Sequence, residues 1–134
     1  DVLNAAGLKP GVTLGKVVAG GAMMGPAVEN LSYPTTKTTS GLIMLSAAAA
    51  EPPQVNPCIR CGRCVEYCPM GLEPVEVNQA YAARDVQELG KLHVDYCFNC
   101  GSCTFVCPAK RPCTQMMGLA KAFYPGEIKK GGNK

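Results

Sequence analysis

The sequence predicts an α+β fold in two parts, a short segment with strands followed by an all-helical domain rich in cysteine. Composition changes near residue 50 of the 134, and all nine cysteines lie after that point. Short apolar runs bounded by glycine and proline precede it, and segments with helical periodicity follow it. The sequence therefore predicts two parts of different composition and structure.

The first part, residues 1–46, is predicted to contain a short helix and two strands. Residues 1–6 have the pattern of a helix end stopped by Gly7. The apolar runs 16–19 and 41–45 have strand character and are punctuated by turn residues. Residues 47–56 contain a proline pair, and they are predicted to be a linker.

The cysteines of the second part form two copies of one spacing. Each copy has three cysteines at intervals of three positions, then a fourth four positions later that is followed by proline. The copies are Cys58, Cys61, Cys64 and Cys68-Pro69, and Cys97, Cys100, Cys103 and Cys107-Pro108. This spacing is typical of a ferredoxin-type domain with two [4Fe–4S] clusters, in which the fourth cysteine binds the neighbouring cluster. We therefore predict one cluster on Cys58, Cys61, Cys64 and Cys107, and the other on Cys97, Cys100, Cys103 and Cys68.

Two alternatives explain cysteine-rich sequences in other ways. Zinc sites usually collect four thiolates as two CxxC pairs separated by a longer stretch, whereas here three cysteines lie within seven residues. A disulfide framework needs an oxidising compartment, and nothing in this sequence resembles a secretion signal. The spacing favours iron–sulfur clusters, and a structural metal module without redox activity remains open.

Residues 57–124 are predicted to form a helical cluster domain. Pro74 stands at the first turn of one helix, where proline is tolerated. Residues 85–88 have the pattern of a capping box that begins a second helix. A third helix is predicted from Thr114 to Phe123, followed by a disordered tail at 125–134. Helix-favouring residues between the two motifs distinguish this domain from small ferredoxins with strands there.

Residues inside the cysteine loops bear on cluster potential. Gly62 and Gly101 occupy the same position in the two copies, where a missing side chain lets the backbone approach the cluster. Arg60 and Arg63 predict a higher reduction potential for the first cluster if they lie near it, because positive charge stabilises the reduced state. The alternative is that both arginines point into solvent and shift the potential little.

Composition narrows the function classes. The formal charge of +3 becomes about −1 if each cluster with its thiolates carries roughly −2. No basic face interleaved with aromatic residues is present, so nucleic-acid binding is not indicated. The longest apolar stretches are too short or too glycine-rich to span a bilayer. Cys113 is predicted to be a small buried side chain, with a redox or ligand role as the alternative. His93 is predicted to be a helix-end or interface residue, and neither residue is counted as a site.

Two stretches together resemble a known family. The sequences at 18–25 and 33–45 look like the end of a soluble-ligand-binding β-grasp domain, and 57–124 looks like a helical double-cluster domain. The combination resembles the C subunit of the Rnf-type electron-transport complex, the ion-pumping ferredoxin:NAD+ oxidoreductase of bacterial membranes. The chain begins partway through the β-grasp domain, so it looks like a fragment of such a protein.

The resemblance implies a function and a setting. It implies electron transfer through the two clusters in a membrane-associated, NAD-linked complex, with other redox subunits as partners at the cytoplasmic face of the cell membrane. Ferredoxin or a flavoprotein is a further partner to consider. FMN and NAD(H) would bind in an upstream domain of the family, and no residue here is assigned to them. Whether the chain itself is an enzyme stays open, since no residue is predicted to be catalytic.

Two other functions remain open. A flavo-iron–sulfur cobalamin reductase of bacterial microcompartments has a similar architecture. A β-grasp binding module would instead bind a small ligand through residues 1–46.

Overall fold

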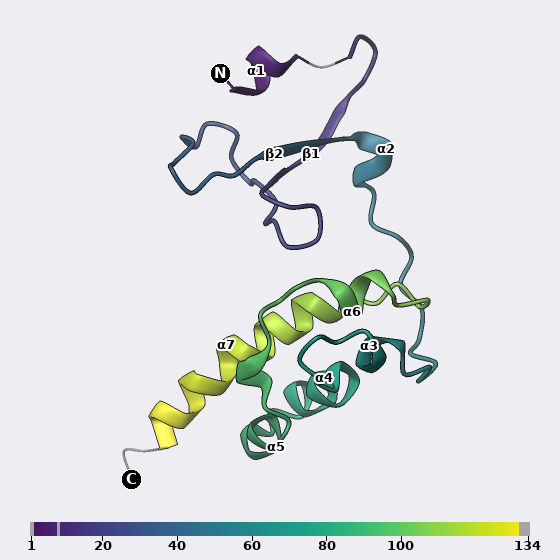
Figure 1. Cartoon of the computed structure of the whole chain (residues 1–134), viewed down its shortest axis with the longest axis vertical. Helices are drawn as coiled ribbons and strands as arrows, with labels where there is room; N and C mark the ends of the chain where they lie inside the picture. The colour runs from purple at the N-terminus through teal and green to yellow at the C-terminus, as the bar shows by residue number, and fades with distance from the viewer. Residues whose placement is uncertain (1, 8, 132–134) are drawn as a thin grey trace. The chain divides into compact units, whose positions relative to one another are not determined.

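The computed structural model describes residues 2–7 and 9–131. The chain divides into two compact units, the first ending at Pro53 and the second beginning at Gln54 (Figure 1). This division falls within the stretch predicted to be a linker. Among the described residues, no helix has both the length and the apolar character needed to cross a bilayer.

The first unit contains a two-stranded antiparallel sheet. Strand β1 spans Leu14–Ala19 and strand β2 spans Leu42–Ser46, with Val17 opposite Met44. These strands confirm the two apolar runs within two residues at each end. A register shift lies at Gly15, where an added Cβ would stand 2.6 Å from the Cα of Ala47. Only glycine allows this close approach of the two backbones.

Short helices stand at both ends of this sheet in the sequence. Helix α1 spans Val2–Ala6 and stops at Gly7, which has a φ of +70° and donates its N–H to the carbonyl of Leu3 at 3.2 Å. The predicted helix end is therefore confirmed for these residues, while Asp1 lies outside the described residues. Helix α2, Ala47–Ala50, occupies the start of the predicted linker. It forms because Ser46 caps it and alanine has the highest helix propensity.

All regular elements of the second unit are helical over residues 54–131. They are α3 (Arg63–Glu66), α4 (Pro74–Ala82), α5 (Val86–Lys91), the 3₁₀-helix η1 (Val94–Tyr96), α6 (Ser102–Phe105) and α7 (Cys113–Gly131). Asp85 caps α5 by accepting the N–H of Glu88 at 2.9 Å, which confirms the predicted helix start. Between the two cysteine motifs the chain forms helices and no strand, as the sequence predicted.

Helix α7 differs from the prediction at both ends. It begins one residue early, at Cys113, and continues through Pro125 to Gly131 instead of ending near Phe123. The predicted helix stop at Pro125 was therefore wrong, whereas the disordered tail at 125–134 stays a prediction. Proline removes only one i to i−4 hydrogen bond and its fixed φ is close to the helical value, so a helix can continue through it at some energetic cost. Residues 132–134 lie outside the described residues.

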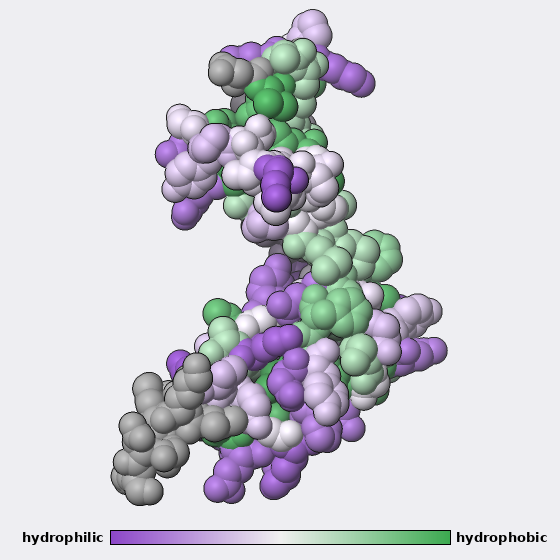
Figure 2. Space-filling view, turned by 60° about the vertical axis from the view of Figure 1, so that its left-hand side comes forward, coloured by the Kyte–Doolittle hydropathy of each residue, from purple (hydrophilic) through white to green (hydrophobic). Residues whose placement is uncertain are grey.

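The hydrophobic core of the second unit is small and joins four helices. It lies between α4, α5, η1 and α7, where Val77, Leu89 and Val94 have no exposed surface. Tyr81 of α4 meets Phe123 of α7 edge-to-face, with ring centroids 5.7 Å apart. Figure 2 shows hydrophobic and hydrophilic side chains interspersed on one face of this unit. The core therefore packs α7 against α4 and α5, and the cysteine loops lie beside this core.

The second unit is an internal repeat in its backbone as well as in its cysteines. Equivalent residues are 39 positions apart, as Cys58 and Cys97 are. Arg60 has a φ of 50° and its counterpart Asn99 a φ of 56°, and Gly62 (78°) corresponds to Gly101 (89°). Helices α4 and α7 begin at the equivalent positions Pro74 and Cys113. Differences between the two copies therefore identify what is particular to each cysteine loop.

Candidate metal centre

Each cysteine loop turns sharply at its glycine into a one-turn helix. Gly62 caps α3 in the left-handed conformation, and an added Cβ would meet no atom within 4 Å, so the backbone φ alone favours glycine there. The carbonyl of Gly62 accepts the N–H of Val65 at 2.9 Å, and that of Gly101 accepts the N–H of Thr104 at 3.1 Å. The turn brings cysteines of one copy to the same side of the loop.

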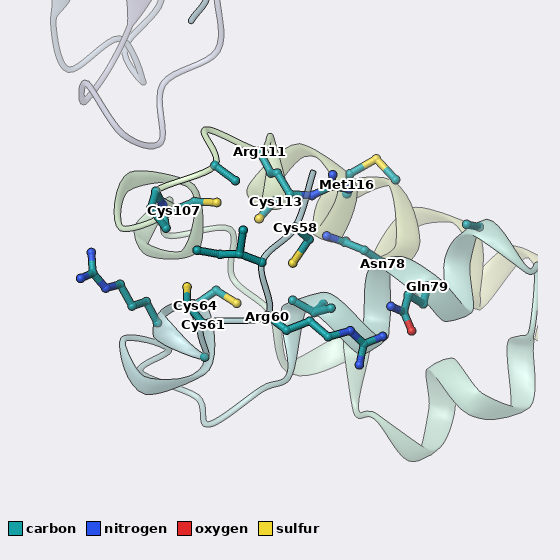
Figure 3. A pocket seen from close by; sticks show the side chains of 17 residues that line it. Cys58, Arg60, Cys61, Cys64, Asn78, Gln79, Cys107, Arg111, Cys113 and Met116 are labelled. Atoms are coloured by element: carbon teal, nitrogen blue, oxygen red, sulfur yellow. The ribbon is translucent and has the colours of Figure 1, made fainter. Parts of the chain in front are cut away.

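Four of the predicted ligands line one cavity. Its volume is about 220 Å³, and Cys58, Cys61 and Cys64 share it with Cys107 of the second motif. Figure 3 shows these side chains together with Cys113 around the same space. This first cavity is also lined by Val75, Asn78 and Ala82 of α4 and by Cys113 and Met116 of α7.

The other four predicted ligands line a second, smaller cavity. It has a volume of about 20 Å³ and contains Cys97, Cys100 and Cys103 together with Cys68 of the first motif. Its walls include Leu72, Pro74, Thr114 and Met117. Each cavity is thus lined by three cysteines of one motif and one of the other.

The side chains at both cavities fit a thiolate-bound cluster. Each cavity is lined by four of the motif cysteines, the ligand number and type that [4Fe–4S] clusters take, and the first cavity has Cys113 in addition. Within residues 2–7 and 9–131, no three His, Cys, Asp or Glu side chains form a group that could hold a single metal ion.

Burial changes the acidity of the innermost thiols. Desolvation raises the pKa of Cys64 and of Cys103, while nearby backbone N–H groups oppose that shift in both. A raised pKa means that these thiols are protonated at neutral pH without a metal. Cluster binding must therefore release protons, because the thiolate is the ligand.

Polar contacts of the cysteine sulfurs are concentrated at the second cavity. Cys68 Sγ accepts the N–H of Leu72 at 3.3 Å. The Cys97 thiol donates to Asn99 Oδ1 at 3.4 Å, a bond that only the protonated sulfur can make. Cys100 Sγ and Cys103 Sγ each lie 3.4 Å from a hydroxyl oxygen, those of Ser102 and Thr114. Sequence analysis missed these contacts, although the polar residues within the second loop were visible in the motif.

The arginines of the first loop are directed toward solvent. The side chain of Arg60 is 67% exposed, and its Nη1 lies 3.6 Å from Glu76 Oε1. When the amide of Gln79 is oriented with its nitrogen toward Glu76, the amide oxygen of Gln79 accepts an N–H of Arg60 at 2.8 Å. Arg63 is also exposed. This geometry favours the alternative in which the two arginines shift the cluster potential little.

Cys113 lies closer to the predicted ligands than the sequence indicated. It is 3% exposed, which agrees with a buried side chain, and it packs against Cys64 and Cys103. Burial raises the pKa of Cys113 to about 12. The residue equivalent to Cys113 in the repeat is Pro74, which lines the second cavity. The repeat therefore carried a signal that Cys113 lies at the first cavity.

Two further polar residues can be placed. Asn78 of α4 points into the first cavity toward Cys58 (Figure 3), and its Oδ1 is buried without a hydrogen-bond partner. Sequence analysis missed Asn78, which belongs to no motif.

His93 precedes η1 and stacks on Tyr96 at 5.3 Å between ring centroids. It is a helix-end residue, as predicted.

Comparison with known proteins agrees with this geometry. Residues 57–110 match the family described as a 4Fe-4S dicluster domain. The second unit therefore contains a ferredoxin-like 4Fe–4S dicluster domain, and the chain as a whole combines helices with a small antiparallel sheet.

The resemblance to the Rnf-type family is also confirmed. The chain is similar to the C subunit of the ion-translocating oxidoreductase complex of Rhodobacter capsulatus, with 42% identity over 77 residues, 58% of this chain and 15% of the relative. It is 44% identical over 59 residues to the C subunit of the proton-translocating ferredoxin:NAD(+) oxidoreductase complex of Clostridium ljungdahlii, covering 44% of this chain and 13% of the relative. The Na(+)-translocating counterpart from Acetobacterium woodii is 38% identical over 72 residues, 54% of this chain and 16% of the relative. The chain thus spans less than a fifth of the length of these relatives.

Proposed function

We propose that this chain transfers single electrons through two adjacent [4Fe–4S] clusters, one in each cavity. The observation that carries the proposal is the sorting of eight cysteines into two sets of four, each with one member from the other motif. The match to a 4Fe-4S dicluster domain supports the type of cluster. When bound, the clusters would supply reversible one-electron redox chemistry.

The residues have distinct roles in this proposal. Cys58, Cys61, Cys64 and Cys107 hold the first cluster, and Cys97, Cys100, Cys103 and Cys68 hold the second. Because each motif contributes to both sites, the two clusters are held at a fixed separation by the same short loops. The helical core of α4, α5 and α7 keeps the loops in place.

The setting of the relay is proposed from the relatives. Their names place them in ion-translocating and ferredoxin:NAD(+) oxidoreductase complexes. We therefore propose that the chain acts in such a complex, peripheral to the cytoplasmic face of the membrane and in contact with other redox subunits. Residues 1–46 would be the end of a β-grasp domain, and 57–124 the double-cluster domain. FMN and NAD(H) chemistry is not assigned to any residue of this chain.

Metal analysis and reductive titration test the proposal. The chain is purified without oxygen, its iron and acid-labile sulfide are counted, and electron paramagnetic resonance is recorded as dithionite is added. We expect about eight irons and two reducible signals per chain. Zinc without a reducible signal would contradict electron transfer and support the structural metal module.

Other functions are less well supported. The names of the relatives favour the membrane complex over the cobalamin reductase of microcompartments. A small-ligand module in residues 1–46 has a place to bind, since a cavity of about 860 Å³ is lined by Val17, Ala27 and Tyr33 among others. Among the described residues that line this cavity, no convergent set of charged groups selects a ligand.

A further inference from the structure

The two cavities differ at two positions that are equivalent in the repeat. Thr104 and Thr114 stand at the second cluster loop and helix α7, where the first copy has Val65 and Val75. Threonine and valine have nearly the same shape, so the difference is one hydroxyl at each position. Thr114 lines the second cavity as Val75 lines the first.

The two threonines form a hydrogen-bonded chain that ends on a ligand sulfur. Thr104 Oγ1 accepts the backbone N–H of Thr114 at 2.8 Å and lies 2.8 Å from Thr114 Oγ1. Thr114 Oγ1 in turn lies 3.4 Å from Cys103 Sγ. A cluster-bound thiolate is only an acceptor, so the Thr114 hydroxyl must donate to Cys103. The hydroxyl of Thr104 then donates to Thr114, and the chain polarises toward the sulfur.

Two more sulfurs of the second cavity, those of Cys68 and Cys100, lie against a group that can donate a hydrogen bond. Ser102 Oγ lies 3.4 Å from Cys100 Sγ, and the N–H of Leu72 donates to Cys68 at 3.3 Å. Lys121 donates to the backbone carbonyl of Cys97, which brings a positive charge to this loop. In the repeat, Ser102 and Leu72 correspond to Arg63 and Arg111 of the first cavity.

The first cavity has fewer such contacts. Among the described residues, no side-chain N–H or O–H group forms a hydrogen bond to Cys58, Cys61, Cys64 or Cys107. Asn78 is directed into this cavity, and Arg60, Arg63, Gln79 and Arg111 also line it. In the described part of the chain, none of these side chains donates a hydrogen bond to a cysteine sulfur. The charge of Arg60 is shared with Glu76 at the exposed rim.

We propose that the cluster on Cys97, Cys100, Cys103 and Cys68 has the higher reduction potential of the two. This inference rests on the proposed function, because it needs a cluster in each cavity. Reduction adds one electron to a cluster that is already anionic, and hydrogen bonds to its sulfurs stabilise the added charge. The first electron from an external donor therefore resides in the second cavity, and the order is the reverse of the one the loop arginines predicted.

A reciprocal exchange of the hydroxyl tests this order. Wild type, T114V and V75T are purified without oxygen, and each is titrated with dithionite while its paramagnetic signals are recorded. We expect T114V to lower the higher of the two midpoint potentials and leave the lower one in place. V75T should raise the lower midpoint, because it adds a hydroxyl at the equivalent wall of the first cavity. T114S, which keeps the hydroxyl, should restore the wild-type value.

The outcomes separate this inference from the function on which it rests. Iron and sulfide counts near the wild-type value in all variants show that both clusters are present. If T114V then lowers the lower midpoint, or moves neither, the proposed order is wrong while electron transfer stands. If wild type itself has no reducible signal, the proposed function fails first. If T114V loses iron, T104V is titrated in its place, because it removes only the outer hydroxyl. We expect T104V to lower the higher midpoint by a smaller amount. If T104V moves neither midpoint, the proposed order is wrong.

Discussion

Exchange of ligands between the two motifs can be tested by removing cysteines in pairs. Cys68 lines only the second cavity, although its neighbours in sequence, Cys61 and Cys64, line the first. Cys68→Ala should therefore remove the cluster of the second cavity and leave the other. The loss of the hydrogen bond from Leu72 should add only about 1 kcal/mol of destabilisation. The expected result is a fall from about eight irons per chain to about four.

Double variants show which cluster has been lost. C68A/C97A removes two ligands of the same cavity and should still hold about four irons, whereas C68A/C58A removes one ligand from each cavity and should hold almost none. If each motif instead bound its own cluster, the two results would be exchanged. The assay is iron and sulfide analysis of protein purified without oxygen, with the paramagnetic signal as an independent count. The C113A variant is the matched control, and it should keep about eight irons.

Three changes test the fold around the site. Leu89→Ala empties a fully buried position and should lower the free energy of unfolding by about 2–5 kcal/mol. The measurement is urea denaturation followed by circular dichroism. A change below about 1 kcal/mol would contradict the core described for α5. Asp85→Ala removes the cap of α5 and should lower the same free energy by about 1 kcal/mol, while Asp85→Asn should retain most of it. Gly62→Ala places a side chain at a φ of +78°, where no atom obstructs it, so only backbone strain of about 1–2 kcal/mol is expected. Complete loss of the clusters in Gly62→Ala would show that the backbone there must approach them.

Much of the fold could be predicted because its signals are local. The strands at β1 and β2 follow from apolar runs bounded by turn residues, and the start of α5 follows from a single capping side chain, Asp85. The end of α7 could not be predicted in this way. Proline at position 125 is a local signal to stop, yet the helix continues to Gly131. A proline removes only one backbone hydrogen bond of a helix, so this local signal disfavours the helix without forbidding it.

The sequence by itself determined the cysteine repeat and the kind of protein that the chain resembles. These depend on spacing along the chain, which covalent geometry converts directly into a loop with its thiols on one side. Only the tertiary structure decided which side chains contact those thiols. Thr114 meets Cys103 across ten intervening positions because α6 packs beside α7, and Asn78 and Cys113 reach the first cavity from two different helices. Such contacts depend on how helices pack, and helix packing is set by the whole core rather than by any one motif.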